Sequence, residues 1–417
     1  MRFAQLFIKS YVMVLLAVST CTGQSTEGIK TEVSEQDTID ADVAYLTEPT
    51  IDADIPAGNI VLDKYSNDTI FVHQELRDTS GDWFYWAMRA RGCQGRTITF
   101  FFTQSDAVGV RGPVISSDHG KTYGYADARD ITRNRFTYTF PEDAYEVWIY
   151  ECFPYLPAMW DSFVKSIPTK VKYDTGILCQ SRKGVNVPYF HIGKGKYKVV
   201  LTSRHHCAES TGTFVLEGIA SAFTEENRLG RTLRNAIDLT IVPFVDIDGA
   251  IAGDQGKNRM PHDHNRDYTD FLYPETRAIA QLMKDKAPSM CLDVHSPWLY
   301  GDYHEFIFTP MADPQIVHDA EKENLFSSLL EKNQEGGLRY MASNDLPFGE
   351  SWNTSSNYNS GASFITWSLM NIPSLEIGRS IEVPFANANG AVVTPSALKE
   401  FGHGLARTML EIALLNP

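Results

Sequence analysis

The second half of the chain alternates between short apolar runs and longer segments in which apolar residues recur every three or four positions. KYKVVLTS, IDLTIVPFV and SMCLDVHS are short and rich in β-branched residues, which predicts buried strands. ESTGTFVLEGIASAFTE, YPETRAIAQLMKDKAP and SALKEFGHGLARTMLEIALL have the spacing of amphipathic helices. Strands that alternate with helices predict an α/β fold, with a mixed and mostly parallel sheet and helices on both faces. We assign this fold to residues 166–417.

The first half has a different pattern. RTITFFFT, NRFTYTF and YEVWIYECF are rich in aromatic and β-branched residues, and turn-like stretches such as SSDHGKTYG separate them. Short strands at this spacing, without a helical period between them, predict an all-β sandwich over residues 59–165 that precedes the α/β domain. We expect its aromatic residues to form a core, with a sugar-binding face as the alternative.

The start of the chain has the pattern of an export signal. Residues 1–21 contain the apolar stretch YVMVLLAV, which is too short to span a bilayer as a helix. Cys21 leaves two outcomes open, namely cleavage with plain secretion, or lipid attachment as in a bacterial lipoprotein. We therefore expect an exported protein that is periplasmic, anchored to the outer membrane through Cys21, or secreted. Residues 22–58 are predicted to be an acidic linker, because the stretch 31–63 has nine acidic residues and no Lys or Arg.

Charge and cysteine content exclude some classes of function. The net charge is −15 and no run of Lys and Arg stands out, so we expect no nucleic-acid partner. Apart from Cys21, five cysteines are scattered along the chain without a CxxC pair, which predicts neither a disulfide framework nor a cysteine metal site.

The stretch SRHHCAES, which follows the strand-like run YKVVLT, contains candidate metal ligands. His206 and Glu209 are three positions apart, so both side chains lie on one side of a single turn. A catalytic zinc site needs a third ligand and keeps a fourth position open. His295, at the end of the predicted strand SMCLDV, meets this need, because functional groups of α/β sheets gather at the carboxyl ends of strands. We expect these three residues to bind one zinc ion, with His205 as a rival ligand.

Three further residues complete the chemistry of a hydrolase. Glu376 in NIPSLEIGRS stands at the end of another apolar run, where it could take a proton from a water and return it to a leaving amine. The stretch GKNRMPHDHNRDY contains Arg259 and Arg266, and a guanidinium group binds a carboxylate through two hydrogen bonds. Developing charge on an attacked carbonyl also needs an electropositive partner, which one of these arginines can supply.

Taken in chain order, HCAE, VPFVDIDG, HNRDY, DVHS and SLEIG resemble the motifs of the M14 zinc carboxypeptidases over about residues 195–415. The resemblance implies that Arg259 polarises the substrate carbonyl, that Asn265 and Arg266 hold the terminal carboxylate, and that Tyr358 closes over the substrate. The match departs from the family where Asp246-Ile247-Asp248-Gly249 stands for Asn-Pro-Asp-Gly. The β-rich first half is similar to the cytosolic carboxypeptidase branch, although this chain is expected to be exported and that branch's preference for acidic tails is not carried over.

The sequence thus predicts an exported zinc metallocarboxypeptidase that acts on peptides with a free C-terminal carboxylate. One alternative is a zinc amidase or deacylase that acts on cell-wall peptides or acylated amino acids, since the same zinc and glutamate would serve. The other alternative is a peptide-binding protein that has lost catalysis. The retention of every candidate ligand and of Glu376 argues against that alternative.

Overall fold

The computed structural model describes residues 49–81 and 83–415. The predicted signal peptide and most of the predicted linker lie outside the described residues. The last part of the linker range, however, belongs to the fold: strand β1 (Thr50–Asp52) pairs antiparallel with β4 (Ala87–Arg91), and Ile51 is buried. Strand β1 thus falls within residues 22–58, the range predicted as a linker.

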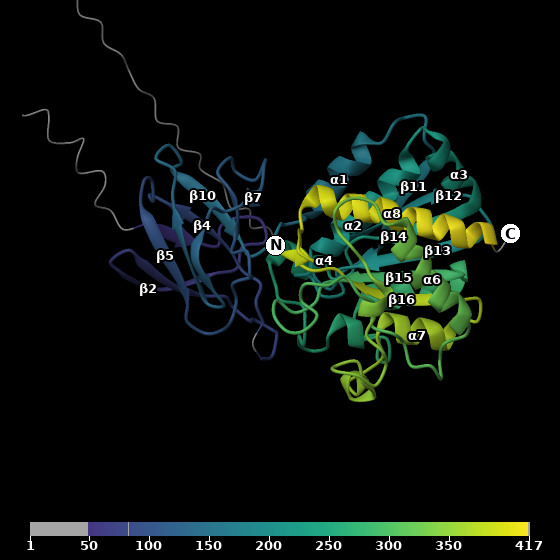
Figure 1. The fold of residues 1–417 in the computed structure, drawn as a ribbon. Helices are drawn as coiled ribbons and strands as arrows, with labels where there is room; N and C mark the ends of the chain where they lie inside the picture. Colours follow the sequence, from purple (N-terminus) through teal and green to yellow (C-terminus); the bar gives the residue numbers. More distant parts are fainter. Residues whose placement is uncertain (1–48, 82, 416–417) are drawn as a thin grey trace, which may run out of the picture. The chain divides into compact units, whose positions relative to one another are not determined.

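Residues 50–150 form two five-stranded sheets. The first has the order β1-β4-β10-β6-β7 and adds the strands β6 (Val114–Ser116), β7 (Gly124–Tyr125) and β10 (Glu146–Tyr150). The second has the order β2-β3-β5-β9-β8 and contains β2 (Val61–Ser66), β3 (Thr69–His73), β5 (Thr97–Phe102), β8 (Arg129–Thr132) and β9 (Arg135–Thr139). Along β5 every second residue is buried, as the alternating pattern predicts. Several of these strands are visible in Figure 1.

Buried residues of both sheets form one hydrophobic cluster. Trp86 is central to it: its ring packs against Phe102 and stacks on Phe136 at centroid distances of 4.8 and 5.8 Å. The aromatic residues of this region thus supply a core, as expected. All described residues nevertheless belong to one compact unit, so a separate β-sandwich domain over residues 59–165 stays a prediction.

The second half contains a six-stranded sheet of order β11-β12-β14-β13-β15-β16. Its strands are β11 (Tyr173–Gln180), β12 (Asn186–Gly193), β13 (Tyr197–Ser203), β14 (Ile237–Val242), β15 (Met290–His295) and β16 (Ile377–Glu382). The pairs β13–β14, β13–β15 and β15–β16 are parallel, whereas β11–β12 and β12–β14 are antiparallel. The predicted mixed, mostly parallel sheet is confirmed.

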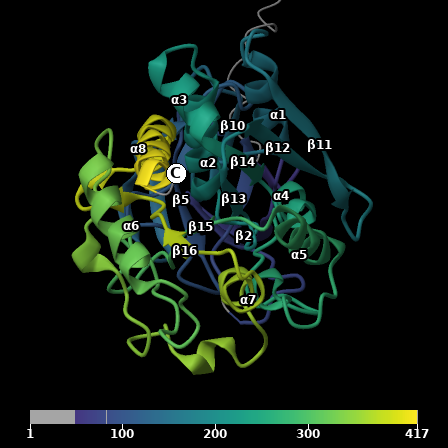
Figure 2. The ribbon, with the colours of Figure 1, turned by 90° about the vertical axis from the view of Figure 1, so that its right-hand side faces the viewer.

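Helices cover both faces of this sheet. They are α1 (Pro157–Ser166), α2 (Thr211–Thr224), α3 (Arg228–Ala236), α4 (Ile247–Ala252), α5 (Pro274–Lys286), α6 (Ala320–Asn333), α7 (Phe364–Asn371) and α8 (Pro395–Leu415). Figure 2 shows α2, α6 and α8 on one side of the strands and α4, α5 and α7 on the other. A Cβ on Gly218 of α2 would lie 2.2 Å from the carbonyl oxygen of Lys399, so this glycine permits the close approach of α8. A short hairpin of β17 (Asn387–Ala388) and β18 (Ala391–Val392) precedes α8.

The register of the parallel strands determines where the functional groups lie. Ser203, the last residue of β13, pairs with Val294, and His295 pairs with Glu382 at the end of β16. The carboxyl ends of three neighbouring strands therefore meet at one edge, and the segments that leave them form the site described next. Among the described residues, no helix combines the length and the apolar character that crossing a membrane requires.

Candidate active site

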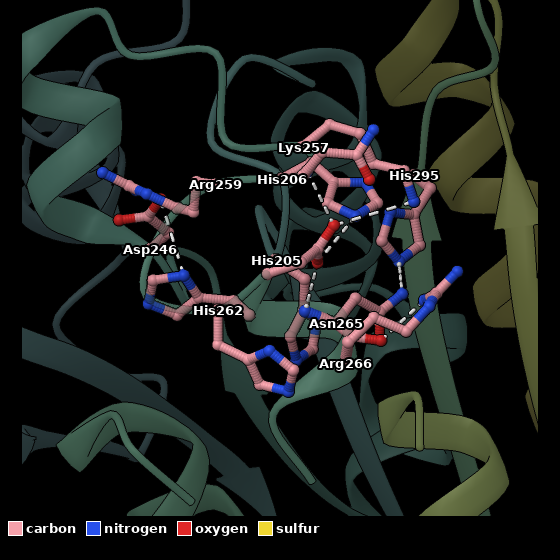
Figure 3. Close-up of polar contacts among 12 residues, drawn as sticks. His205, His206, Asp246, Lys257, Arg259, His262, Asn265, Arg266 and His295 are labelled. Atoms are coloured by element: carbon pink, nitrogen blue, oxygen red, sulfur yellow. Dashed lines mark hydrogen bonds and ion pairs between the residues drawn. The ribbon is translucent and has the colours of Figure 1, made fainter. Parts of the chain in front are cut away.

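The turn between β13 and α2 brings two predicted ligands together with the end of β15. His206 Nδ1 lies 2.8 Å from Glu209 Oε1, and His295 Nδ1 lies 2.7 Å from Glu209 Oε2 (Figure 3). All three side chains are buried, and the potential ligand atoms lie within 4.8 Å of one another. The structure therefore places the predicted trio around one point.

Electrostatics favour a divalent metal at that point. Burial alone would raise the pKa of the Glu209 carboxyl, but the adjacent His206 and His295 lower it to about 2. Two imidazole nitrogens and an ionised carboxylate form the donor set of many catalytic zinc sites, which leave a position open. The residues present thus fit a catalytic metal ion.

A chain of buried hydrogen bonds orients His295. Its Nε2 lies 2.7 Å from Asp293 Oδ2, and the other oxygen of Asp293 lies 2.9 Å from His205 Nδ1. His205 Nε2 in turn lies 2.7 Å from the hydroxyl of Tyr268. The rival ligand His205 therefore faces Asp293 instead of Glu209, and its contacts hold the His295 ring with Nδ1 toward the ligand cluster.

A cavity of about 250 Å³ opens beside the ligand cluster, and all three predicted substrate-binding residues line it. Asn265 and Arg266 belong to a 3₁₀ turn, His264–Arg266, that is capped by Asp263. Arg266 donates from Nε to the carbonyl oxygen of Asn357 at 2.9 Å and from Nη1 to that of Asn265 at 2.7 Å. Within the described part of the chain it has no carboxylate partner, so its charge is available to a ligand.

Tyr358 lies above this arginine. The Arg266 guanidinium carbon is 5.0 Å from the centroid of the tyrosine ring, and the Tyr358 hydroxyl donates to Asn353 Oδ1 at 3.1 Å. The ring and the guanidinium together form one wall of the cavity.

Glu376, the predicted general base, does not line this cavity. It directly precedes β16, and its Oε1 lies 2.8 Å from Lys322 Nζ. The glutamate that does line the cavity is Glu382, at the opposite end of the same strand and in register with His295. The correction has a simple cause: β16 begins after Glu376, and only its carboxyl end reaches the site.

Glu382 has the environment of a proton-transfer group. Its Oε2 is buried and has no hydrogen-bond partner among the described residues. Burial raises the pKa of the Glu382 carboxyl to about 7, and the negative charge of Glu209 acts in the same direction. A carboxyl with a raised pKa beside a metal-ligand cluster can both accept and donate a proton near neutral pH.

Arg259, predicted to polarise the substrate carbonyl, is also found elsewhere. Its Nη2 lies 2.6 Å from Asp78 Oδ2 and 3.0 Å from Asp254 Oδ2, and its Nη1 bonds Asp246. In Figure 3 the Arg259 side chain points toward Asp246 and away from His295. Three carboxylates hold it in the wall of a second cavity of about 360 Å³. The short loop between Arg259 and Asn265 cannot be traced from sequence, which is why the assignment failed.

Lys257, two residues earlier, supplies a cation to the first cavity instead. Its Nζ lies 3.7 Å from Asp263 Oδ2, and burial lowers the pKa of its ammonium group. Sequence reasoning missed Lys257, Glu382 and also Trp83, which lines the cavity from the β-rich first half. Neither Glu382 nor Trp83 had a local signal in the sequence that set it apart.

Comparisons with known proteins agree with this geometry. The structure resembles the metallo-carboxypeptidase from Burkholderia cenocepacia with a TM-score of 0.71 and 15% identity, over 89% of this chain and 100% of that one. It resembles the Pseudomonas aeruginosa metallo-carboxypeptidase, solved in complex with (2-guanidinoethylmercapto)succinic acid, with a TM-score of 0.70 and 18% identity, over 87% and 98% of the two chains. The fold is therefore that of the metallo-carboxypeptidases.

Sequence relatives point the same way. The chain is 23% identical to human cytosolic carboxypeptidase 6 over 339 residues, which is 72% of this chain and 60% of that protein. It is 22% identical to mouse cytosolic carboxypeptidase 3 over 187 residues, which is 40% of this chain and 19% of that protein. The chain thus spans less than two thirds of these curated relatives, and no protein-family model matches it. The chain is therefore similar in sequence to the cytosolic carboxypeptidases and in fold to the metallo-carboxypeptidases, in agreement with the M14 resemblance of its motifs.

Proposed function

We propose that the protein is a zinc-dependent metallocarboxypeptidase that hydrolyses C-terminal peptide bonds, with Glu382 as its general base. One observation carries the proposal: a single cavity contains a metal donor set, an arginine without a carboxylate partner among the described residues, and a buried glutamate oxygen without a hydrogen-bond partner there. Unpaired buried polar groups cost stability, so their presence beside a metal donor set in one cavity favours a role in binding and catalysis.

His206, Glu209 and His295 would hold one zinc ion. Zinc in this place would polarise a substrate carbonyl and lower the pKa of a water molecule. The hydrogen bond from Asp293, which His205 also contacts, would orient the His295 ring with Nδ1 toward Glu209.

Glu382 moves the proton. Its free Oε2 would take a proton from water and then deliver it to the nitrogen of the leaving residue. The pKa of about 7 suits both halves of this task, because the same group must be a base first and an acid afterwards.

Two cationic residues would interact with different negative charges of the substrate, namely its terminal carboxylate and the charge that develops on the attacked carbonyl oxygen. Arg266 and Asn265 would bind the free carboxylate, with Tyr358 covering it. Lys257 takes over the role predicted for Arg259, since its ammonium group lies in the cavity where charge develops on the attacked carbonyl oxygen.

The test uses a peptide pool in which half of the peptides have free C-termini and half have amidated ones. Zinc-loaded protein should release single C-terminal residues from the free set alone, as read by mass spectrometry. The Glu382→Gln variant should release none, whereas Glu376→Gln, the matched control just before the same strand, should behave as wild type. Release from amidated peptides would contradict a carboxylate clamp, and no release from either set would contradict the proposed activity.

Three further points belong to the same proposal. We propose that residues 1–21 direct export, that Cys21 is either lipid-modified or removed with the signal, and that residues 59–165 act as a β-sandwich domain. Fractionation of cells that express the full chain, with Cys21→Ala for comparison, tests the first two. Retention of the mature protein in the cytosol would contradict export.

A further inference from the structure

The wall of the active-site cavity is divided chemically. One part carries the metal ligands, Lys257, Asn265, Arg266 and Glu382. The other part is apolar and is made of three tryptophans and two prolines: Trp83, Trp298, Trp352, Pro297 and Pro310. The polar part has a role in the proposed reaction, but the apolar part has none so far.

Trp83 and Trp298 form a fixed aromatic pair. Their ring centroids are 4.6 Å apart, with the planes inclined at 63°. Phe84, which is buried, supports the pair from behind, with its centroid 5.2 Å from Trp298 at an angle of 83°. Edge-to-face contacts of this kind hold rings in place, so the pair presents a preorganised surface.

The segment that carries Trp83 is fastened to the catalytic loop on both sides. Before it, the Ser80 amide donates to the carbonyl oxygen of Asn258 at 3.0 Å, next to the Asp78–Arg259 ion pair. After it, the Gln255 side chain bonds both backbone groups of Tyr85 at 2.7 Å. Trp83 is therefore held against the loop that carries Lys257, although 174 positions separate the two residues in sequence.

Burial gives the direction in which a peptide lies. Asn265 and Arg266 are 7% and 6% exposed, so the carboxylate clamp is at the inner end of the cavity. Trp83 and Trp298 are partly exposed, and Trp352 is 40% exposed. A peptide that enters with its carboxylate first thus leaves the residues upstream of the cut beside the tryptophans.

Trp83 also has an unused hydrogen-bond donor. Its indole Nε1 is buried and has no acceptor among the described residues. An unsatisfied buried donor costs stability, which is consistent with a ring placed for binding instead of for the fold.

We propose that Trp83 and Trp298 form a subsite for an aromatic or large apolar side chain on the residue immediately before the scissile bond. The β-rich first half thereby binds substrate directly. The inference rests on the proposed function for the orientation of the peptide, because the clamp defines which end is innermost.

The experiment measures binding, so that it does not depend on turnover. Zinc-loaded Glu382→Gln protein is titrated calorimetrically with acetyl-Phe-Ala, acetyl-Ala-Ala and acetyl-Ala-Phe. Acetyl-Phe-Ala should bind about tenfold more tightly than acetyl-Ala-Ala, which is the advantage of one good aromatic contact. In the same background Trp83→Ala should remove this preference, and Trp83→Phe should retain most of it.

A tryptophan outside the cavity provides the control. Trp148→Ala alters a partly buried tryptophan of the same β-rich region and should leave the preference unchanged. Equal binding of acetyl-Phe-Ala and acetyl-Ala-Ala by protein with intact tryptophans would overturn the subsite. So would a preference that survives Trp83→Ala, or one that favours acetyl-Ala-Phe.

Failure of the subsite and failure of the proposed activity remain distinguishable. If wild-type protein releases C-terminal residues but acetyl-Phe-Ala has no advantage, the activity stands and the subsite is wrong. If wild-type protein releases nothing while the Trp83-dependent preference is present, the subsite stands and the activity is wrong.

Discussion

Two cavities draw charged side chains from the same short segment, residues 256–266, yet they use charge in opposite ways. In the larger one Arg259 is surrounded by Asp78, Asp246 and Asp254. In the smaller one Arg266 contacts two backbone carbonyl groups and has no carboxylate partner among the described residues. Only seven positions separate the two arginines. Arg259 is paired with carboxylates of the protein, whereas Arg266 can bind the carboxylate of a ligand.

The comparison teaches where to look for function. A guanidinium with three carboxylates stabilises the fold and has little capacity left for a ligand, whereas a buried cation without a carboxylate partner is a binding group. The glutamates at the two ends of β16 repeat the lesson. Glu376, just before the strand, pairs with Lys322 outside the cavity, whereas Glu382 lines the cavity and has no ion-pair partner among the described residues.

The largest expected effect separates the two glutamates. Glu382→Gln should lower kcat by about 10²- to 10⁴-fold, the usual contribution of a positioned general base. Glu376→Gln should leave kcat within about twofold of wild type, because Glu376 does not line the cavity and its Oε1 pairs only with Lys322. Steady-state release of C-terminal residues measures both, and equal losses in the two variants would end the assignment of Glu382.

The next expected effect concerns metal content. His206→Ala should lose its stoichiometric zinc, because one of three ligands is missing. His264→Ala provides the comparison, since His264 is equally buried but lines the other cavity. Elemental analysis after gel filtration should find zinc in the second variant alone; a full equivalent of zinc in His206→Ala would contradict the ligand set.

Substitution of Arg259 should change stability, whereas substitution of Arg266 should change substrate binding. Arg259→Gln removes the guanidinium partner of the buried Asp246 carboxylate and should lower the free energy of unfolding by about 3–5 kcal/mol in urea titrations. Arg266→Gln should leave stability nearly unchanged but raise KM for peptides with a free carboxylate. If Arg266→Gln proves as destabilising as Arg259→Gln, the assignment of Arg266 to binding and of Arg259 to stability is wrong.

The smallest expected effect is a pH dependence in the larger cavity. Burial raises the pKa of Glu275 from 4.5 to about 7, so the folded state binds this proton more tightly than the unfolded state does. Its contribution to stability is complete below pH 4.5 and is lost as the pH rises through 7. Glu275→Gln should therefore gain roughly 1–3 kcal/mol over wild type between pH 5 and pH 8. Parallel pH profiles of unfolding free energy would contradict this.

Local patterns were sufficient for the strands β13, β14 and β15 and for the grouping of His206, Glu209 and His295. The spacing of His206 and Glu209 is set by one turn of chain, and His295 was predicted at a strand end that the structure places at the same residue. The ligand spacing and the strand end both depend on residues that are close in sequence, so a single sequence is enough to predict them.

Long-range pairing determined the rest. Leu375-Glu376-Ile377 and Ile381-Glu382-Val383 have the same apolar pattern, and only the register with β15 shows which glutamate reaches the site. Arg259 was misassigned for a similar reason, because its partner Asp78 is 181 positions away. No local sequence signal connects Glu382 with His295 or Arg259 with Asp78.

The bonds between the Asp78–Tyr85 segment and the loop around Arg259 also limit how this chain can be recombined. A chimera joined near residue 165 would take Trp83 from one parent and the loop that fastens it from another. Such a hybrid could keep its metal and its base and still lose the wall that orients the substrate. Exchange of substrate preference between relatives therefore requires that both segments be inherited together, as one discontinuous unit.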